Sequence, residues 1–147
     1  MGDENASVIV RQWVDEVLND GRLDAAGRLL SEDVVFHHAG VPQPLRGVEA
    51  VKRLVAGLRA AFPDLHSPIL DLTAQDDRVS VRFRWRGTHR GEFQGWPPTR
   101  RPVTVHGSAL YRVRGGRIAE AWADFDTVGL MRQLGETVAI GDSGVTG

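Results

Sequence analysis

The spacing of apolar residues predicts three helices in the first part of the chain. The first helix is amphipathic, because its apolar residues follow an i, i+3, i+4, i+7, i+8 pattern: Val10, Trp13, Val14, Val17 and Leu18. A second helix is expected over residues 23–30 and a third over residues 48–62, where Pro63 interrupts the pattern. Between these two, residues 33–38 are rich in β-branched and aromatic side chains and predict a short strand.

The pattern changes to that of strands after residue 67. Residues 68–74 predict one strand, and residues 79–86 predict a second, in which apolar side chains alternate with a serine and three outward-facing arginines. Two longer strands are expected over residues 103–114 and 117–125, joined by a two-glycine hairpin turn. A last helix is expected over residues 128–134, with Asp126 as its N-cap.

The element order is therefore α-α-β-α-β-β-β-β-α. It predicts an α+β fold, in which a curved, mostly antiparallel sheet of four to six strands wraps around helices as a cone. The open end of the cone is expected to form an internal apolar pocket, the kind of place where small-molecule chemistry is found. Residues 1–135 are expected to form this single domain, and residues 136–147, which lack a periodic apolar face, a flexible tail.

Composition narrows the classes of function. The 147 residues include 18 Lys and Arg against 19 Asp and Glu, and this balance argues against nucleic-acid binding, which requires a one-sided basic field. The sequence contains no cysteine, which excludes thiolate nucleophiles and Cys-ligated metals. It also lacks an apolar run of membrane-spanning length and the start of a signal peptide, so we expect a cytoplasmic protein that has no membrane partner.

Several motifs go beyond periodicity. They are Thr-His-Arg-Gly-Glu-Phe at residues 88–93, Gly-Trp-Pro-Pro-Thr-Arg-Arg at residues 95–101, Gly-Arg-Ile at residues 116–118 followed by Glu120 and Trp122, and Asp126 followed by Gly-Leu-Met-Arg-Gln-Leu-Gly at residues 129–135. In order and spacing these motifs resemble those of the SnoaL-like polyketide (ester) cyclases. That family belongs to the cone-shaped α+β superfamily that includes ketosteroid isomerase and scytalone dehydratase. The resemblance implies a cofactor-free fold whose studied members close a polyketide ring by intramolecular aldol condensation, often as homo-oligomers.

The resemblance also implies a place for the acid/base residue. In the cyclases this residue is a strand-borne Asp, with His or Gln beside it on the last two long strands. An ungapped alignment over residues 116–135 puts the Asp position on Ala123, and its polar neighbours fall on Gly107, Ala109 and Ala121. A one-residue bulge would bring Asp124 to the catalytic position instead.

Three residues are candidates for proton transfer. Asp124 is the candidate base, and the alternative is that it lies on the outward face of its strand, solvated or paired with an arginine. His89, in the Thr-His-Arg-Gly loop, and His37, at the end of the first strand, are the candidate proton donors, because imidazole changes its charge near neutral pH. For His89 the alternative is a hydrogen bond to the loop backbone. A regular strand with His37 in the pocket would turn His38 toward solvent.

The substrate pocket is expected to be lined by aromatic and small residues: Trp13, Phe36, Gly107, Ala109, Tyr111, Ala121, Ala123 and, in a rim loop, Trp96. The small residues leave room for a ligand, and Trp13 and Tyr111 offer flat surfaces to a planar ring system. No cofactor is implied, and the spacing of the histidines does not favour a metal site.

The sequence leaves two classes of function open. The first is binding of a small hydrophobic carbonyl compound with cofactor-free acid/base chemistry: intramolecular aldol cyclisation, isomerisation or dehydration. The second is a non-catalytic ligand-binding or assembly module that has lost the acid/base residue of the cyclases. A cofactor-free oxygenase or an epoxide hydrolase, both resembling other members of the superfamily, is a third alternative, although no second carboxylate is evident on the pocket floor.

Overall fold

The protein is described here by a computed structural model that covers residues 2–38 and 41–135. Its helical segments are α1 (Gly2–Gln12), η1 (Trp13–Asn19), η2 (Leu23–Ala25), α2 (Ala26–Leu29), α3 (Val48–Ala61) and α4 (Thr127–Gln133). Its strands are β1 (Leu30–His38), β2 (Leu45–Arg46), β3 (Ile69–Gln75), β4 (Arg78–Thr88), β5 (Pro102–Arg114) and β6 (Arg117–Phe125). The expected tail, residues 136–147, lies outside the described residues.

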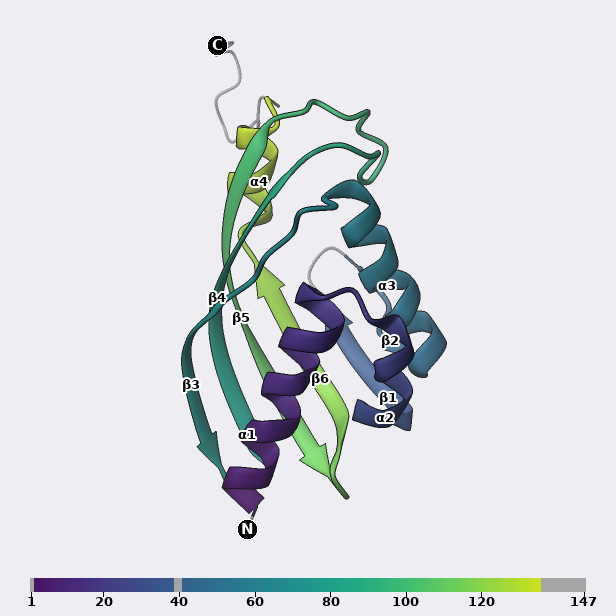
Figure 1. Ribbon diagram of the computed structural model, residues 1–147, viewed down its shortest axis with the longest axis vertical. Coiled ribbons are helices and arrows are strands. Elements are labelled where there is room, and N and C mark those ends of the chain that lie inside the picture. Colours follow the sequence, from purple (N-terminus) through teal and green to yellow (C-terminus); the bar gives the residue numbers. More distant parts are fainter. Residues whose placement is uncertain (1, 39–40, 136–147) are drawn as a thin grey trace.

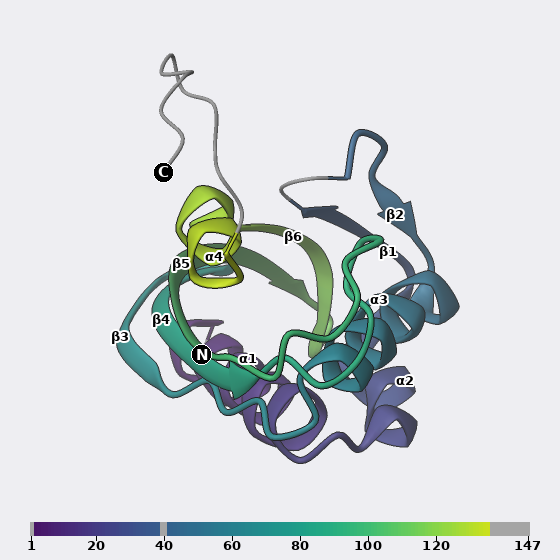
Figure 2. The same ribbon diagram turned by 90° about the horizontal axis from the view of Figure 1, so that it is seen from above.

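The six strands form one mixed sheet in the order β2-β1-β6-β5-β4-β3. β1 runs parallel to β6, and the other neighbouring strands pair antiparallel. The sheet is strongly curved and stays open, with its strands bending round the side on which α1 and α3 lie (Figures 1 and 2). The α+β cone expected from the sequence is thereby confirmed.

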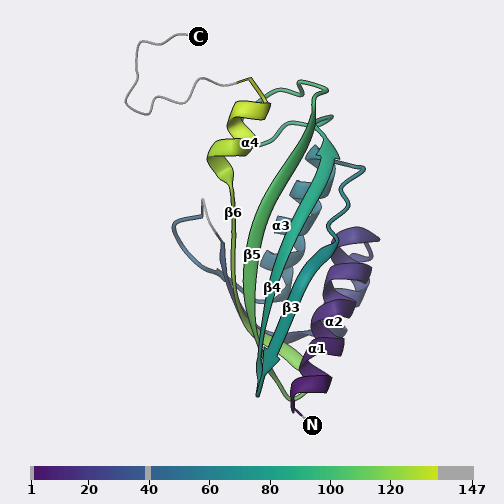
Figure 3. The same cartoon turned by 90° about the vertical axis from the view of Figure 1, so that its left-hand side faces the viewer.

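Helices α1 and α3 lie on the same side of the sheet, whereas α4 lies beyond the end of β6 (Figure 3). Alternation places the buried apolar residues of the strands on the side of these helices, because successive side chains of a strand point to opposite faces. Along β4, for example, Val79, Val81 and Trp85 are buried, and the arginines between them face outward. One apolar stripe of α1 and η1, which includes Val10, Trp13 and Val17, covers this side of the sheet.

The core is divided into two clusters. The larger one lies between the stripe of α1 and η1, the buried side of α3, and the inner residues of the sheet. The smaller one lies at the other end of the sheet, where Phe62 packs edge-on against Trp85 with ring centroids 5.0 Å apart and α4 contributes Leu130 and Leu134. The space between the two clusters is where a cavity forms, as described below.

The structure differs from the sequence prediction in the segment after the first helix. The helix expected over residues 23–30 is present over residues 23–29 as the 3₁₀ turn η2 followed by the single turn of α2, and it ends one residue early because Leu30 already pairs with Ile118 as part of β1. Gly27 weakens any helix there, because glycine is a poor helix former. The end of the first helix is also π-helical, from Trp13 to Asn19.

The turn and capping signals in the sequence are confirmed. Gly115 and Gly116 both have positive φ, 62° and 78°, as the hairpin between β5 and β6 requires. The Asp126 side chain accepts a hydrogen bond of 2.8 Å from the Gly129 backbone N–H and caps α4. None of the helices within the described ranges is both long and apolar enough to cross a membrane.

Candidate functional site

An apolar cavity of about 80 Å³, the inner cavity, lies between the helices and the inner side of the sheet. Its wall is made by aromatic and aliphatic side chains from η1, α3 and strands β1, β3, β4, β5 and β6, with few polar groups. The polar or titratable side chains in the described lining are Ser67, His38, Trp13 and Tyr111. No carboxylate belongs to this lining within residues 2–38 and 41–135.

Trp13 and Tyr111 form a polar contact in the cavity wall. Trp13 is 1% exposed and packs edge-on against Phe36, with ring centroids 5.7 Å apart. The indole N–H can only donate, and its interaction with the Tyr111 oxygen partly offsets the rise that burial causes in the pKa of the Tyr111 hydroxyl. Burial raises the pKa of the Tyr111 hydroxyl, which therefore keeps its proton and can donate it to another acceptor.

A second space of about 340 Å³, the vestibule, lies next to the inner cavity. The two share part of their lining: His38, Leu54, Leu58 and Phe125. The vestibule adds residues of α3 and of the loop that follows β4, including Arg53, Glu92 and Phe93. A ligand in the vestibule would therefore reach the inner cavity past His38 and Phe125.

His38 lies where these spaces meet. Val34 and Phe36 are buried on the inner side of β1, so alternation places His38 on the inner side as well. Its ring packs edge-on against Phe125, with centroids 5.3 Å apart. The structure thus reverses the expected orientation of the two histidines, with His38 lining the cavity and His37 on the outer face. The apolar residues Val34 and Phe36 are the sequence signal for this orientation, because their burial on the inner face places His38, which is in step with them, on the same face.

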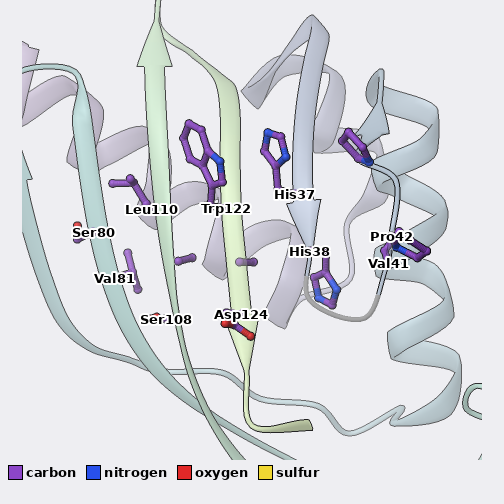
Figure 4. Close-up of a pocket in the computed structure, with 13 residues that line it drawn as sticks. His37, His38, Val41, Pro42, Ser80, Val81, Ser108, Leu110, Trp122 and Asp124 are labelled. Carbon is purple, nitrogen blue, oxygen red and sulfur yellow. The ribbon is translucent and has the colours of Figure 1, made fainter.

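A wider groove of about 630 Å³, the outer groove, lies on the opposite face of the sheet, beside the loop that follows β1 (Figure 4). Asp124 is exposed and lines this groove together with Ser108 and Trp122. β5 and β6 keep a regular register from Gly107↔Phe125 to Arg112↔Glu120, and the irregularity lies before Val113. No bulge therefore turns the Asp124 carboxylate into the inner cavity, and it stays on the face of Glu120 and Trp122.

His37 takes part in a polar network on this outer face. Its Nε2 donates to Glu120 Oε2 at 2.8 Å, and Arg112 Nη2 donates to Glu120 Oε1 at 3.0 Å. The His37 ring stacks on Trp122 with an interplanar angle of 6° and centroids 5.2 Å apart. The hydrogen bonds from His37 and Arg112 hold the pKa of the Glu120 carboxyl below its ordinary value. His37 is thus placed away from the inner cavity.

His89 is fully buried and lines neither the cavity, the vestibule nor the outer groove. The Thr99 backbone N–H donates to its Nδ1 at 3.1 Å, and the ring packs against Phe62 at 5.4 Å. Because Nδ1 accepts a hydrogen bond, the ring proton is on Nε2, which has no hydrogen-bond partner within the described chain. The contacts tie the ends of the loop at residues 89–100 together instead of forming part of a pocket.

Only some of the residues expected to line the pocket do so in the structure. Those that line the inner cavity are Trp13, Phe36, Ala109, Tyr111 and Ala123. Gly107 does not, because the Phe83 ring lies over it, and Ala121 is fully buried in the core. Trp96 packs on the smaller core cluster and is likewise absent from the described lining of all three spaces.

Comparison with known proteins gives consistent matches along the chain. The sequence profile of the SnoaL-like polyketide cyclase family matches residues 8–134. The chain is 30% identical over 132 residues to the aklanonic acid methyl ester cyclase DnrD of Streptomyces peucetius, covering 87% of this chain and 89% of the relative.

Solved structures give the same picture of the fold. IdmH, a candidate polyketide cyclase from Streptomyces antibioticus, superposes with a TM-score of 0.78 at 33% identity, covering 89% of this chain and 99% of that protein. A SnoaL-like polyketide cyclase candidate from Jannaschia sp. CCS1 superposes with a TM-score of 0.86 at 23% identity, covering 93% and 96% of the two chains, and supports the fold alone.

Proposed function

The chain belongs to the SnoaL-like polyketide cyclase family, and we propose that it binds a small hydrophobic, carbonyl-bearing molecule in the inner cavity and vestibule and closes a ring in it by an intramolecular aldol reaction. The observation that carries this proposal is the apolar cavity itself, with a protonated tyrosine hydroxyl in its wall and a histidine at its junction with the vestibule.

The sizes of the two spaces indicate how a ligand would lie. Pockets for drug-sized molecules measure about 300–1,000 Å³, so the inner cavity of about 80 Å³ is too small for a whole polyketide, whereas the vestibule of about 340 Å³ is of suitable size. A ring system in the vestibule would send its reactive carbonyl chain past Phe125 into the inner cavity. There the small side chains of Ala109 and Ala123 leave room for it.

Confinement supplies part of the catalysis in this proposal. Holding an enolisable carbon close to a carbonyl of the same molecule replaces a search among chain conformations with one reactive geometry. The apolar wall excludes water and strengthens any hydrogen bond from the Tyr111 hydroxyl to the carbonyl oxygen on which charge develops. No cofactor enters these steps.

Aklanonic acid methyl ester, the compound in the name of the DnrD relative, is the probe we choose. Binding is followed as a rise in melting temperature with probe concentration, because a ligand that binds only the folded state stabilises it by mass action. Turnover is followed by chromatography, since the aldol product has the same mass as the probe and one carbonyl fewer. A new isomer that forms only with the protein supports the proposed reaction.

Two neighbouring residues of β5 provide a matched pair of variants that locates the bound probe. Ala109 lines the inner cavity and also borders the outer groove, whereas Ser108 lines only the outer groove. Because side chains alternate along β5, Ala109→Leu adds its bulk to the inner cavity and Ser108→Leu adds similar bulk to the outer groove. We expect Ala109→Leu to weaken probe binding by about tenfold or more, which corresponds to about 1.4 kcal/mol, and Ser108→Leu to leave it within about twofold. Circular dichroism verifies that both variants fold. Loss of binding in Ser108→Leu alone would place the ligand in the outer groove and contradict the proposal.

The second candidate function is non-catalytic binding of the same class of molecule. It is favoured by the absence of a carboxylate from the described lining of the inner cavity and by the outward position of Asp124. A probe that raises the melting temperature and is recovered unchanged after long incubation would support this second function and exclude the first for that compound.

A further inference from the structure

The described lining of the inner cavity holds two side chains that can exchange protons in water, His38 and Tyr111. Tyr111 is 5% exposed and keeps its proton, so it can donate a hydrogen bond but is a poor base at ordinary pH. Imidazole, in contrast, accepts and releases protons near neutrality. Among the described lining residues, His38 is therefore the group suited to remove a proton from a bound molecule.

The sheet register places the two groups on either side of the small residues. His38 is the neighbour of Ala123, which pairs with Ala109, so these three lie in one row across the sheet. Tyr111 pairs with Ala121 in the next inward-facing row, which is about 7 Å further along the strands. A carbonyl group lying over the two alanines would have the tyrosine hydroxyl on one side and the imidazole on the other.

Resting on the proposed function above, we propose that His38 is the catalytic base of the inner cavity and that Tyr111 stabilises the enolate that His38 generates. The position that the family resemblance gives to an aspartate is Ala123, the direct neighbour of His38 on the adjacent strand. An imidazole reaching over Ala123 from β1 would serve the space that a carboxylate on β6 would serve.

The proton and bond changes balance without another reactant. The neutral imidazole takes a proton from the carbon α to a ligand carbonyl, which leaves an enolate and an imidazolium. The Tyr111 hydroxyl donates a hydrogen bond to the enolate oxygen. The enolate carbon then attacks a second carbonyl of the same molecule, one carbon–carbon bond forms, and the imidazolium returns its proton to the new alkoxide. The product is an isomer of the substrate.

The charged and titratable groups around His38 come from several elements. Arg53 of α3 and Glu92 of the loop after β4 line the vestibule with it, and Asp124 of β6 lines the outer groove with it. Figure 4 shows Asp124 on β6 below the pair formed by His37 and Trp122, and His38 at the end of β1 beside the following loop. None of these three charged groups belongs to the described lining of the inner cavity, in which the titratable side chains are His38 and Tyr111.

His38→Gln tests the base, because glutamine keeps hydrogen-bonding capacity but cannot carry the proton. The matched control is His37→Gln, the same change one residue earlier on the opposite face. We expect His38→Gln to keep the melting-temperature shift with aklanonic acid methyl ester and to lose about 100-fold or more in its rate of ring closure. The control is expected to stay within about twofold of wild type. Ring closure by His38→Gln at the wild-type rate would overturn the assignment.

A second reaction separates the base from the ring closure. In D₂O a base in the cavity exchanges the α-hydrogens of 2-tetralone, a hydrophobic cyclic ketone, for deuterium, and mass spectrometry follows the exchange. We expect wild type and His37→Gln to accelerate this exchange over buffer and His38→Gln not to. If wild type exchanges the ketone but closes no ring, the proposed reaction fails while the base assignment stands. If wild type exchanges it no faster than buffer, the base assignment fails.

Tyr111→Phe tests the partner role of the hydroxyl. Removing one hydrogen-bond donor to a developing oxyanion lowers rates by about 100-fold or more in enzymes that depend on such a donor. We expect that loss in ring closure and exchange, with binding of the probe retained. Wild-type rates in Tyr111→Phe would remove Tyr111 from the proposal and leave the test of His38 intact.

Discussion

The two adjacent histidines at the end of β1 meet different surroundings because a strand alternates its faces. His37 is held on the outer face by Glu120 and by the ring of Trp122, while His38 packs against Phe125 at the cavity. The buried side chains of Val34 and Phe36 fix this phase, since a slip of one residue would expose both of them. The face on which each histidine lies is thus set by Val34 and Phe36, which are four and two positions before His38.

Asp124→Asn is expected to have little effect on stability or on the inner cavity. The side chain is exposed on the outer face and its carboxylate lines only the outer groove. Surface substitutions of this kind change the free energy of unfolding by about 0.5 kcal/mol or less. Urea denaturation and the ring-closure assay measure the two quantities. A loss of turnover with unchanged stability would show that Asp124 takes part in the reaction after all.

Glu120→Gln is expected to lower stability at neutral pH and to have no such effect in acid. Hydrogen bonds from His37 and Arg112 lower the pKa of the folded Glu120 carboxyl. The stabilisation is therefore fully present above the ordinary pKa near 4.5 and is lost as the pH falls through the lowered folded value. Because the carboxylate is partly exposed, we expect about 1 kcal/mol at pH 7.

Urea denaturation of wild type and Glu120→Gln between pH 7 and pH 3 measures this dependence. Glu49→Gln is the control, since its side chain is 76% exposed and lies 3.7 Å from Lys52 in a surface pair of low value. A difference between wild type and Glu120→Gln that grows toward acid pH would have the wrong sign for the network described.

At the scale of elements, β5 and β6 approach closely where Gly107 faces the inner side. A Cβ atom at residue 107 would collide with the backbone oxygen of Asp124 and with the ring of Phe83. The glycine thus permits the contact between strands and ring and does not enlarge the cavity.

Gly107→Ala is accordingly expected to destabilise the protein by about 1–3 kcal/mol, as overpacking of a core does. Gly57→Ala on α3 is the matched control, because nothing lies within 4 Å of a Cβ there and alanine favours a helix by up to about 1 kcal/mol. Thermal and urea denaturation measure both variants. A Gly107→Ala protein as stable as wild type would show that the strands have room to separate at this point.

The elements are predicted well from the sequence where periodicity is strong. Strict alternation of apolar and polar residues predicts β4, and the glycine pair predicts the hairpin between β5 and β6; both are present in the structure. The short helix over residues 23–30 is predicted correctly up to Leu29, but the start of β1 is not, because Leu30 continues the helical spacing of Leu23 and Ala26 while in the structure it pairs with β6. The pairing between β1 and β6 joins residues that are far apart in the sequence. The spacing of apolar residues within one segment therefore does not predict it.

At the scale of the whole molecule, the pocket depends on how the helices are set against the curved sheet. The sequence predicts that Trp13, Tyr111, Ala109, Ala121 and Ala123 line a pocket, and all of these except Ala121 line the inner cavity. It does not place Asp124, His37 and His89, which the structure puts on the outer face or in the core. Their positions follow from strand phase and from contacts such as that of His89 with Thr99.

The fold brings three spaces together around the end of β1. The inner cavity, the vestibule and the outer groove all have His38 in their lining, although they lie on different sides of the sheet. We propose that the ligand occupies the inner cavity and vestibule, between His38 and Tyr111, and not the outer groove beside Asp124.

The most direct test is a crystal structure of the protein with bound aklanonic acid methyl ester. We expect the ring system in the vestibule and a carbonyl oxygen over Ala109 and Ala123, within hydrogen-bond reach of the Tyr111 hydroxyl, about 2.6–3.2 Å. The carbon next to that carbonyl should face the His38 imidazole. A molecule bound in the outer groove against Trp122 and Asp124, with the inner cavity empty, would contradict the proposed binding site.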